Sequence, residues 1–310
     1  MTDPFADPPP LLEGGGVTVL PAPAPPRPIY FGSTRVYRPS EWAYGETREP
    51  DEVNGRFRIK CPDGRARLYS RCTTWIDSLD DKTALTKWRQ RVILAGLRVD
   101  YTLWPRVRTL VPDPDGNRAE LNEIADLAFA AGDGYTKAQR GTDLHALTAR
   151  WDTLARIPPL PDADAAILAA YARCMETHRL EPVLVERRVV VDDLGVTGTF
   201  DRVVRWDGGL HILDIKTGSI AFSPGKTAQQ LAVYAMGQLY ADDGSLTGLR
   251  KSLPPVNPDV GLVLHLPQDM VTGGSATLLT VDLAKGRQGI ELSREVRAWR
   301  NWSKDVLRPV

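Results

Sequence analysis

The chain has 310 residues, 42% of them hydrophobic, so it is long enough to bury a sizeable core in one elaborated domain or in two. Its 39 basic and 39 acidic side chains cancel, and the pI near 6.9 argues against a uniformly basic nucleic-acid binder. No apolar run approaches the roughly 20 residues that cross a bilayer, and the proline-rich start lacks a signal-peptide pattern, so we expect a soluble, cytoplasmic protein with no membrane partner.

The first part of the chain contains a proline-rich segment followed by a basic one. Residues 1–30 are rich in proline, glycine and alanine, which predicts a disordered or polyproline tail. Residues 56–108 hold thirteen Lys or Arg against five acidic residues, a local excess of about +8. The charge distribution is therefore compatible with nucleic-acid binding even though the net charge is zero.

A hairpin is expected at the start of this basic segment. Residues 56–61 and 66–71 flank Asp63-Gly64, and a two-residue turn there would face Lys60 with Arg67 and Arg58 with Tyr69. A basic ladder of this kind repels itself unless an anion or the solvent relieves the repulsion. We expect Arg58, Lys60 and Arg67 to bind a phosphate backbone, with Tyr69 available for stacking; a merely solvated face is the alternative.

Apolar residues at helical spacing predict the helices. One broken helix or two cover 74–97, and others are expected over 121–131, 137–156, 162–178, 227–242 and 287–305. Asp162 or Asp164 is the expected N-cap of the helix over 162–178. His145 flanks the apolar stripe of its helix, where a packed histidine is commoner than a metal ligand, and Gln230 and Tyr234 share one face of another helix.

A second hairpin is the most informative part of the sequence. Residues 197–206 and 210–217 read as strands around Asp207-Gly208-Gly209. A turn at Asp207-Gly208 sets Asp201 opposite Asp214, whereas a turn at Gly208-Gly209 sets Asp201 opposite Lys216. Either register puts these three side chains on one face, because side chains alternate along a strand.

A third acidic residue joins this pair through the preceding strand, expected over 183–191. An even-length connection centred on Asp193-Leu194 places Glu186 opposite Asp201. Like charges at that spacing repel unless a cation lies among them, and a hard divalent ion would relieve the repulsion. Further strands are expected over 260–266 and 277–283.

Four ordered motifs carry a resemblance to a known family. They lie within residues 137–240 and are Gly141-Thr142-Asp143-Leu144-His145, Gly198-x-x-Asp201, Asp214-Ile215-Lys216-Thr217 and Gln230-Leu231-Ala232-Val233-Tyr234. This arrangement resembles the PD-(D/E)xK nuclease superfamily. More narrowly, it is similar to the RecB-like exonucleases, which include phage-encoded and CRISPR-associated members.

The resemblance implies a catalytic role for Asp201, Asp214 and Lys216. It makes both aspartates, His145 and the backbone carbonyl of Ile215 metal ligands. The expected metal is Mg²⁺ or Mn²⁺, and an imidazole ligand tilts a magnesium site toward manganese. Such an ion could acidify a bound water and polarise a phosphate, while Lys216 orients the water or stabilises the oxyanion.

The remaining implied roles are supporting ones. Glu186 matches a less strict family position and would be an occasional ligand or a group just behind the ligands. Gln230 and Tyr234 would hold the nucleic acid or brace the site. Several relatives hold an iron–sulfur cluster with four cysteines, whereas this chain has only Cys61, Cys72 and Cys174, so we predict no cluster.

The fold and function follow as expectations. We predict an α/β protein with a restriction-endonuclease-like core, a central mixed sheet flanked by helices, over residues 136–310, and an N-terminal region over 31–135 with the basic hairpin and helices. The resemblance implies a Mg²⁺- or Mn²⁺-dependent DNA exonuclease serving phage-type recombination or replication, in the host cytoplasm if phage-encoded. A structure-specific endonuclease and an inactive nuclease fold used for DNA binding are the alternatives, and a recombination partner protein or a homo-oligomer stays open.

Overall fold

The computed structural model describes residues 17–19, 49–110, 113–153, 159–220, 223–268, 275–303 and 306. The chain divides into two compact units, one formed around residues 81–143 and the other holding the strands and the later helices. Among the described residues, no helix combines the length and apolar character needed to span a membrane.

The smaller unit is helical. It contains α2 (Thr83–Val99), α3 (Leu103–Leu110), α4 (Arg118–Ala131) and the start of α5 (Thr136–Thr153). Its core is a small cluster of Leu97, Leu103, Ile124 and Ala128. Gly96 allows α2 and α4 to approach closely, because a Cβ there would lie 1.6 Å from the carbonyl oxygen of Ala128.

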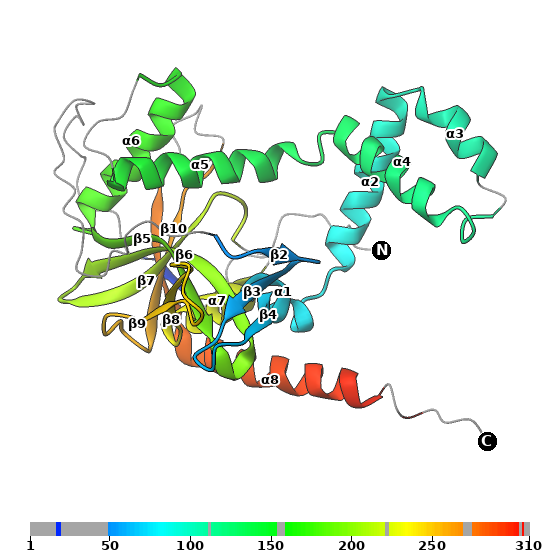
Figure 1. Ribbon diagram of the computed structural model, residues 1–310. Coiled ribbons are helices and arrows are strands. Elements are labelled where there is room, and N and C mark those ends of the chain that lie inside the picture. Colours follow the sequence, from blue (N-terminus) through cyan, green and yellow to red (C-terminus); the bar gives the residue numbers. More distant parts are fainter. Residues whose placement is uncertain are drawn as a thin grey trace. The chain divides into compact units, whose positions relative to one another are not determined.

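The larger unit is built on one mixed sheet (Figure 1). Its described strands are β1 (Val17–Val19), β2 (Glu52–Val53), β3 (Arg56–Lys60), β4 (Ala66–Arg71), β5 (Glu181–Val191), β6 (Val196–Trp206), β7 (Gly209–Lys216), β8 (Gln238–Ala241), β9 (Leu249–Ser252), β10 (Val260–His265) and β11 (Thr277–Asp282). The main path runs β1-β11-β10-β7-β6-β4-β3-β2, while β5 pairs with β6 and β8, and β9 with β8. The β10–β7 and β4–β6 pairs are parallel and the others antiparallel, which confirms the predicted α/β fold with a mixed sheet.

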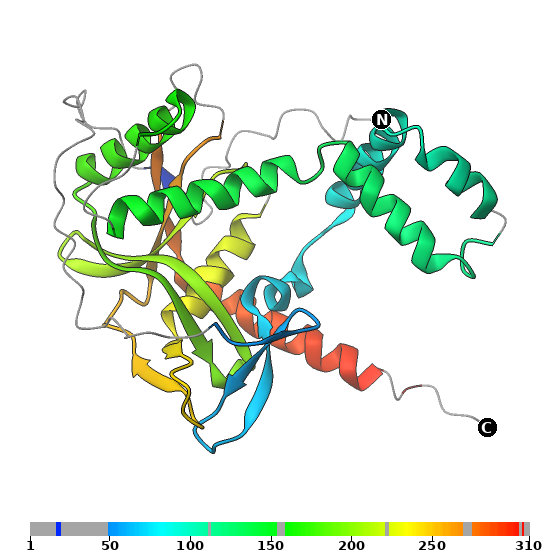
Figure 2. The ribbon, with the colours of Figure 1, turned by 45° about the horizontal axis from the view of Figure 1, so that its top comes forward.

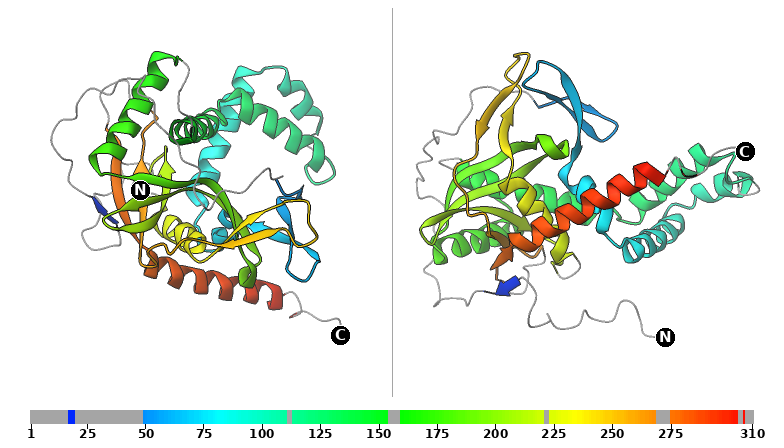
Figure 3. Two further views of the ribbon diagram at one scale, coloured as in Figure 1. Left: turned by 60° about the vertical axis from the view of Figure 1, so that its left-hand side comes forward. Right: turned by 90° about the horizontal axis from the view of Figure 1, so that it is seen from below.

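Helices cover both faces of this sheet (Figure 2). On one side α1 (Cys72–Ile76), α7 (Pro224–Ala235) and α8 (Leu283–Trp302) pack on a cluster that includes Ile212 and Val263. On the other side α5 and α6 (Asp162–Thr177) pack on Leu213, Ile215 and Leu262. Neighbouring residues of β7 and β10 thus enter opposite clusters, as the alternation of side chains along a strand requires. The α8 helix lies against α7 (Figure 3), where a Cβ on Gly286 would be 2.2 Å from the Ala228 carbonyl oxygen.

The basic hairpin forms, but its predicted register is wrong by one residue. Lys60 pairs with Ala66, Arg58 with Leu68 and Ile59 with Arg67. The loop has three residues rather than two, since the Cys61 N–H donates to the Arg65 carbonyl at 2.8 Å and Gly64 takes a φ of +77°. Arg67 therefore lies on the opposite face from Arg58 and Lys60, and the three do not form one ladder.

This hairpin also belongs to a different part of the molecule than we expected. The Ser70 and Arg71 positions of β4 pair in parallel with Val196 and Thr197 of β6, so the hairpin continues the main sheet instead of joining the helices of the region 31–135. Of the predicted tail over 1–30, only β1 is described, and it pairs with β11. The rest of that tail lies outside the described residues.

The helix predicted over 227–242 is wrong beyond residue 235. The α7 helix ends at Ala235, and the chain continues into strand β8 beside β5, where Val189 pairs with Leu239. Gly237 is required at this junction because a Cβ there would lie 2.9 Å from the Cβ of Val189. Tyr240 is consequently a core residue of β8, packed near Tyr69.

Two smaller predictions concern helix ends. The break in 74–97 is real, since α1 and a 3₁₀ turn (Asp77–Leu79) precede α2. The N-cap of α6 is Pro161 and not an aspartate. Asp162 and Asp164 lie within the first turn of the helix, where their negative charges interact favourably with the positive end of the helix dipole.

Candidate metal centre and active site

The hairpin of β6 and β7 sets the geometry of the site. Asp207 and Gly208 have φ values of +47° and +76°, as a two-residue turn with two left-handed residues requires. Trp206 pairs with Gly209, and the ladder runs to Arg202 opposite Leu213. The next facing pair in this register is Asp201 and Asp214, so the first of the two predicted registers is confirmed.

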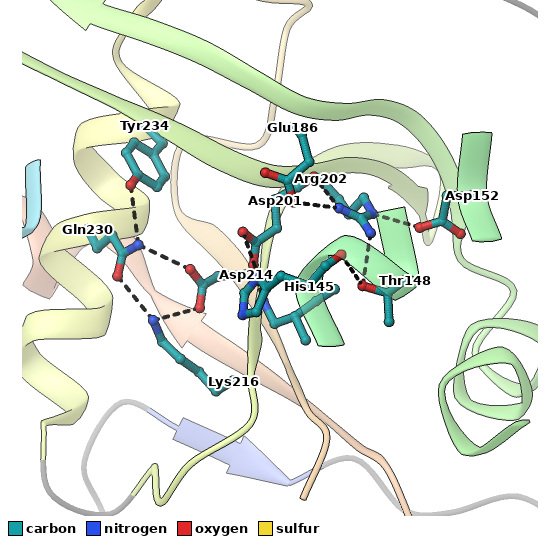
Figure 4. A network of polar contacts seen from close by, with 11 residues as sticks. His145, Thr148, Asp152, Glu186, Asp201, Arg202, Asp214, Lys216, Gln230 and Tyr234 are labelled. Carbon is teal, nitrogen blue, oxygen red and sulfur yellow. Dashed lines mark hydrogen bonds and ion pairs between the residues drawn. The ribbon is translucent and has the colours of Figure 1, made fainter. Parts of the chain in front are cut away.

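Two buried aspartates and a lysine lie together at the end of this ladder (Figure 4). Asp201 and Asp214 are 8% and 3% exposed. An Asp214 Oδ2–Lys216 Nζ distance of 2.8 Å makes an ion pair, and the Ile215 N–H donates to Asp201 Oδ2 at 2.6 Å. The sequence prediction that Asp201, Asp214 and Lys216 share one face is thus met in the structure, whereas a ligand role for the Ile215 carbonyl stays a prediction.

Side chains of α5 and β5 lie close to the same position. His145 of α5 lies with its Nδ1 3.2 Å from Asp201 Oδ1. Glu186 lies where the sequence predicted, between the pairs Val185–Arg202 and Arg187–Phe200, although its φ of +48° interrupts the regular strand. One ligand atom each from His145, Glu186 and Asp201 lies within 4.8 Å of the others.

This donor set fits a divalent metal ion. Carboxylate oxygens suit Mg²⁺ and Mn²⁺, and one imidazole nitrogen is compatible with Mn²⁺. Asp214 is adjacent to the three donors, but its two oxygens contact Lys216 and Gln230 in this structure. Asp214 therefore needs to exchange one of these contacts to become a ligand.

Four acidic or histidine side chains around this position have shifted pKa values. Burial raises the pKa of Glu186 to about 7, with the Asp201 charge adding to the shift. Burial also raises the pKa of Asp214 to about 6, despite the Lys216 ammonium. Burial opposes ionisation of Asp201 too, but hydrogen bonds from His145 and the Ile215 N–H hold its pKa below the usual value. Burial opposes charge on His145, yet the Asp201 hydrogen bond and the nearby carboxylates raise its pKa.

Gln230 connects the acidic and basic groups of the site. Its Nε2 donates to Asp214 Oδ1 at 3.1 Å and to the Tyr234 hydroxyl at 3.3 Å, and its Oε1 accepts from Lys216 Nζ at 3.1 Å. Tyr234 is 3% exposed and its ring packs against Gly198, where a Cβ would lie 2.8 Å from Cε1. The geometry favours the bracing role for both residues over direct contact with nucleic acid.

The basic residues of the β3–β4 hairpin lie in a different setting. Lys60 Nζ contacts Asp242 at 2.7 Å, and Arg67 makes two hydrogen bonds to Asp63. Arg58 is exposed. Tyr69 is 4% exposed and donates to Asp192 at 2.6 Å, so it is not available for stacking. Nucleic-acid binding by Arg58, Lys60 and Arg67 stays a prediction.

The sequence reading missed a second polar cluster behind the metal donors. Arg202 is fully buried and contacts Thr148, Asp152 and Glu186, and Tyr171 donates to Asp152 at 2.6 Å. The sequence does contain a pattern that predicts this cluster: Thr148 and Asp152 follow His145 at helical spacing, and Arg202 lies in the middle of an apolar strand. The cysteines Cys61, Cys72 and Cys174 are free and buried, and the absence of an iron–sulfur cluster stays a prediction.

A comparison with family models identifies the chain. Residues 138–308 match the model described as the PD-(D/E)XK nuclease superfamily, and this range includes His145, Glu186, Asp201, Asp214 and Lys216. No curated protein matches the chain significantly. Because the matched residues make up more than half of the 310, the chain belongs to the PD-(D/E)XK nuclease superfamily.

Proposed function

We propose that this protein is a metal-dependent DNA exonuclease of the RecB-like type, acting in phage-type recombination or replication. Membership of the PD-(D/E)XK nuclease superfamily supports a nuclease activity. The observation that carries the proposal is the convergence of His145, Glu186 and Asp201 on one position, next to the Asp214–Lys216 pair. The order of the four motifs, which is similar to that of RecB-like enzymes, supports the exonuclease type.

The site residues divide the work of phosphodiester hydrolysis. His145, Glu186, Asp201 and, after exchange of a contact, Asp214 would hold the ion. When bound, a divalent ion supplies an acidified water and an electrophile for the phosphate oxygens. Lys216 is half-buried, and its ammonium is held between Asp214 and Gln230, so it can orient a water or stabilise the charge that develops on the phosphate.

The arrangement argues against an inactive fold. Asp214 is 3% exposed, and a buried carboxylate costs several kcal/mol of desolvation, which an apolar residue would avoid. A fold retained only to bind DNA gains nothing from burying Asp201 and Asp214 beside each other. We therefore take the site to be catalytic.

One assay tests the proposal. Purified protein is incubated with linear and circular DNA, single- and double-stranded and labelled at either end, with Mg²⁺, Mn²⁺ or chelator. We expect linear DNA to be degraded from its ends, circular DNA to survive, chelator to stop the reaction, and Asp214→Asn and Lys216→Ala to be inactive. Lys285→Ala is the matched control, because Lys285 is 54% exposed and its Nζ lies 4.0 Å from Asp282, outside the site.

The outcomes separate the alternatives. Cleavage of circular DNA would identify an endonuclease. Activity that persists in chelator, or in Asp214→Asn, would refute the metal-dependent mechanism. Folded wild-type protein that cleaves none of the substrates would favour the inactive fold.

A further inference from the structure

Arg202 is the largest side chain that is fully buried in the described part of the molecule, and it lies directly behind the metal donors (Figure 4). All three of its guanidinium nitrogens have partners. Nε donates to Asp152 Oδ2 at 2.6 Å, Nη2 to Thr148 Oγ1 at 3.2 Å, and Nη1 to both the Asp201 carbonyl at 2.7 Å and Glu186 Oε1 at 3.2 Å.

These partners lie on the same three elements as the metal donors. Thr148 and Asp152 belong to α5, which also carries His145, and the Thr148 hydroxyl donates to the His145 carbonyl at 3.0 Å. Glu186 belongs to β5 and Asp201 to β6. One planar cation thus joins the helix and the two strands that bring the donor atoms within 4.8 Å of one another.

The anchor of this cation is itself fixed. The Arg202–Asp152 pair is completely buried on both sides, and Tyr171 of α6 donates to the same Asp152 oxygen at 2.6 Å. Glu186 is less buried than Asp152: its side chain is 37% exposed, and it accepts a hydrogen bond from Arg202. Arg202 binds one Glu186 oxygen, which leaves the second oxygen for an ion.

Fold stability alone is a poor explanation for this cluster. Burying a guanidinium and a carboxylate has a desolvation cost that well-packed apolar residues of similar volume avoid. A planar guanidinium that makes several hydrogen bonds does, however, fix the orientation of the groups that it contacts. Groups that orient metal ligands in this way set the affinity for the ion.

We propose that Arg202 is a positioning residue for the divalent cation site. It holds Glu186 and the Asp201 backbone in register with His145, and Thr148 and Asp152 lock it to α5. The inference rests on the proposed function, since the cation is the one that the nuclease would use. Arg202 does not touch the cation, yet it controls the affinity of the site for the cation.

The test measures Mn²⁺ binding to the full chain by isothermal titration calorimetry. We expect Arg202→Lys to fold and to bind Mn²⁺ roughly tenfold or more weakly, because lysine keeps the charge but cannot contact Thr148, Asp152 and Glu186 together. Arg205→Lys is the matched control, an arginine on the same strand that is 56% exposed and paired with Glu181. It should bind Mn²⁺ as the wild type does.

A second measurement separates positioning from a merely structural role. Glu186→Gln should also weaken binding, and the double variant with Arg202→Lys should lose less affinity than the two single losses added together, because both changes remove the same Arg202–Glu186 contact. In DNA cleavage, Arg202→Lys should need more Mn²⁺ for half-maximal rate and recover much of the rate at saturation. A structural defect would lower the rate at every Mn²⁺ concentration.

Each outcome bears on the proposal. Folded Arg202→Lys with wild-type affinity for Mn²⁺, or fully additive effects in the double variant, overturns it. If Arg202→Lys does not fold, Thr148→Val decides: it is isosteric and removes one acceptor from Arg202, so reduced affinity supports the proposal and unchanged affinity overturns it. Folded wild-type protein that binds no Mn²⁺ overturns the proposed function itself and, with it, this inference.

Discussion

At the scale of single residues, two facing aspartates have opposite pKa shifts. Asp201 accepts hydrogen bonds from His145 and the Ile215 N–H, which favour its charged form. Asp214 is more deeply buried, and the Asp201 charge adds to the desolvation that raises its pKa to about 6. The pair therefore holds a proton more easily than two isolated aspartates would, and below about pH 6 an ion has to displace that proton from Asp214.

Gln230 gives a prediction at this scale. Gln230→Ala removes the acceptor of Lys216 and a donor to Asp214, so both groups lose their fixed orientation. A hydrogen bond of this kind contributes about 0.5–1.5 kcal/mol, which corresponds to a fall in kcat of roughly twofold to thirteenfold. Steady-state cleavage of end-labelled DNA measures kcat and KM separately. Gln238→Ala, an exposed amide on β8, is the control, and a rise in KM at unchanged kcat would contradict the bracing role.

At the scale of the elements, turn chemistry explains which registers could be predicted. Both hairpins contain Asp-Gly, but Asp207 and Gly208 are both left-handed, whereas in the other loop only Gly64 is. Pro62 fixes its own φ near the value for the first position of a type I turn, which lengthens that loop by one residue. The site hairpin was thus predictable from its turn, and the basic hairpin was not predictable from the Asp-Gly pair alone.

Long-range pairing accounts for the other errors. Residues 236–242 continue the helical spacing of α7, but pairing with β5 makes part of them a strand, and Gly237 is the only local sign of the change. The charge partners of Arg202 lie 50 and 16 residues away in sequence, so spacing alone could not bring them together.

Gly198 of β6 gives a prediction for the packing of α7 on the sheet. A methyl group there would lie 2.8 Å from Tyr234 Cε1 and 3.2 Å from Cys72 Cβ, and Tyr234 cannot move without disturbing Gln230. Gly198→Ala should therefore lower the free energy of unfolding by about 1–3 kcal/mol, measured by urea denaturation. Gly218→Ala is the control, because nothing lies within 4 Å of its new methyl group. An unchanged Gly198→Ala midpoint would refute the close packing.

The β3–β4 hairpin gives a prediction for DNA binding. Arg58 and Lys60 share one face, whereas Arg67 lies on the other and binds Asp63. If the hairpin grips DNA, Arg58→Ala and Lys60→Ala should each reduce the slope of log K against log salt by about 1, and Arg67→Ala should have a smaller effect. Fluorescence anisotropy at several salt concentrations measures this, with Lys285→Ala as control. If the double variant Arg58→Ala/Lys60→Ala keeps the wild-type slope of log K against log salt, these side chains form a solvated face and do not bind DNA.

At the scale of the whole molecule, the candidate site exists only when the larger unit is folded. His145, Glu186, Asp201 and Asp214 come from one helix and three strands, and the unfolded chain does not bring them together. An ion that binds the folded state alone stabilises it by about 2.7 kcal/mol at one hundred times its dissociation constant. Metal binding should therefore be visible in the unfolding of the protein without any DNA.

The size of this stabilisation should depend on pH. Without the ion, the raised pKa values of Glu186 (about 7) and Asp214 (about 6) mean that the folded state binds more protons than the unfolded state, so its stability falls as pH rises through this range. His145, whose pKa is also raised, acts in the same direction. The ion needs these groups deprotonated, so its contribution should instead grow with pH.

We therefore expect Mn²⁺ to raise the urea midpoint more at pH 8 than at pH 6. The measurement is the difference between midpoints with Mn²⁺ and with chelator at each pH, which cancels the fall in stability of the ion-free protein. Asp201→Asn should show almost no difference at either pH, because it removes the donor that His145, Glu186 and the Ile215 N–H surround. A difference as large at pH 6 as at pH 8 would mean that the ion binds without displacing protons, and hence at a site other than these residues.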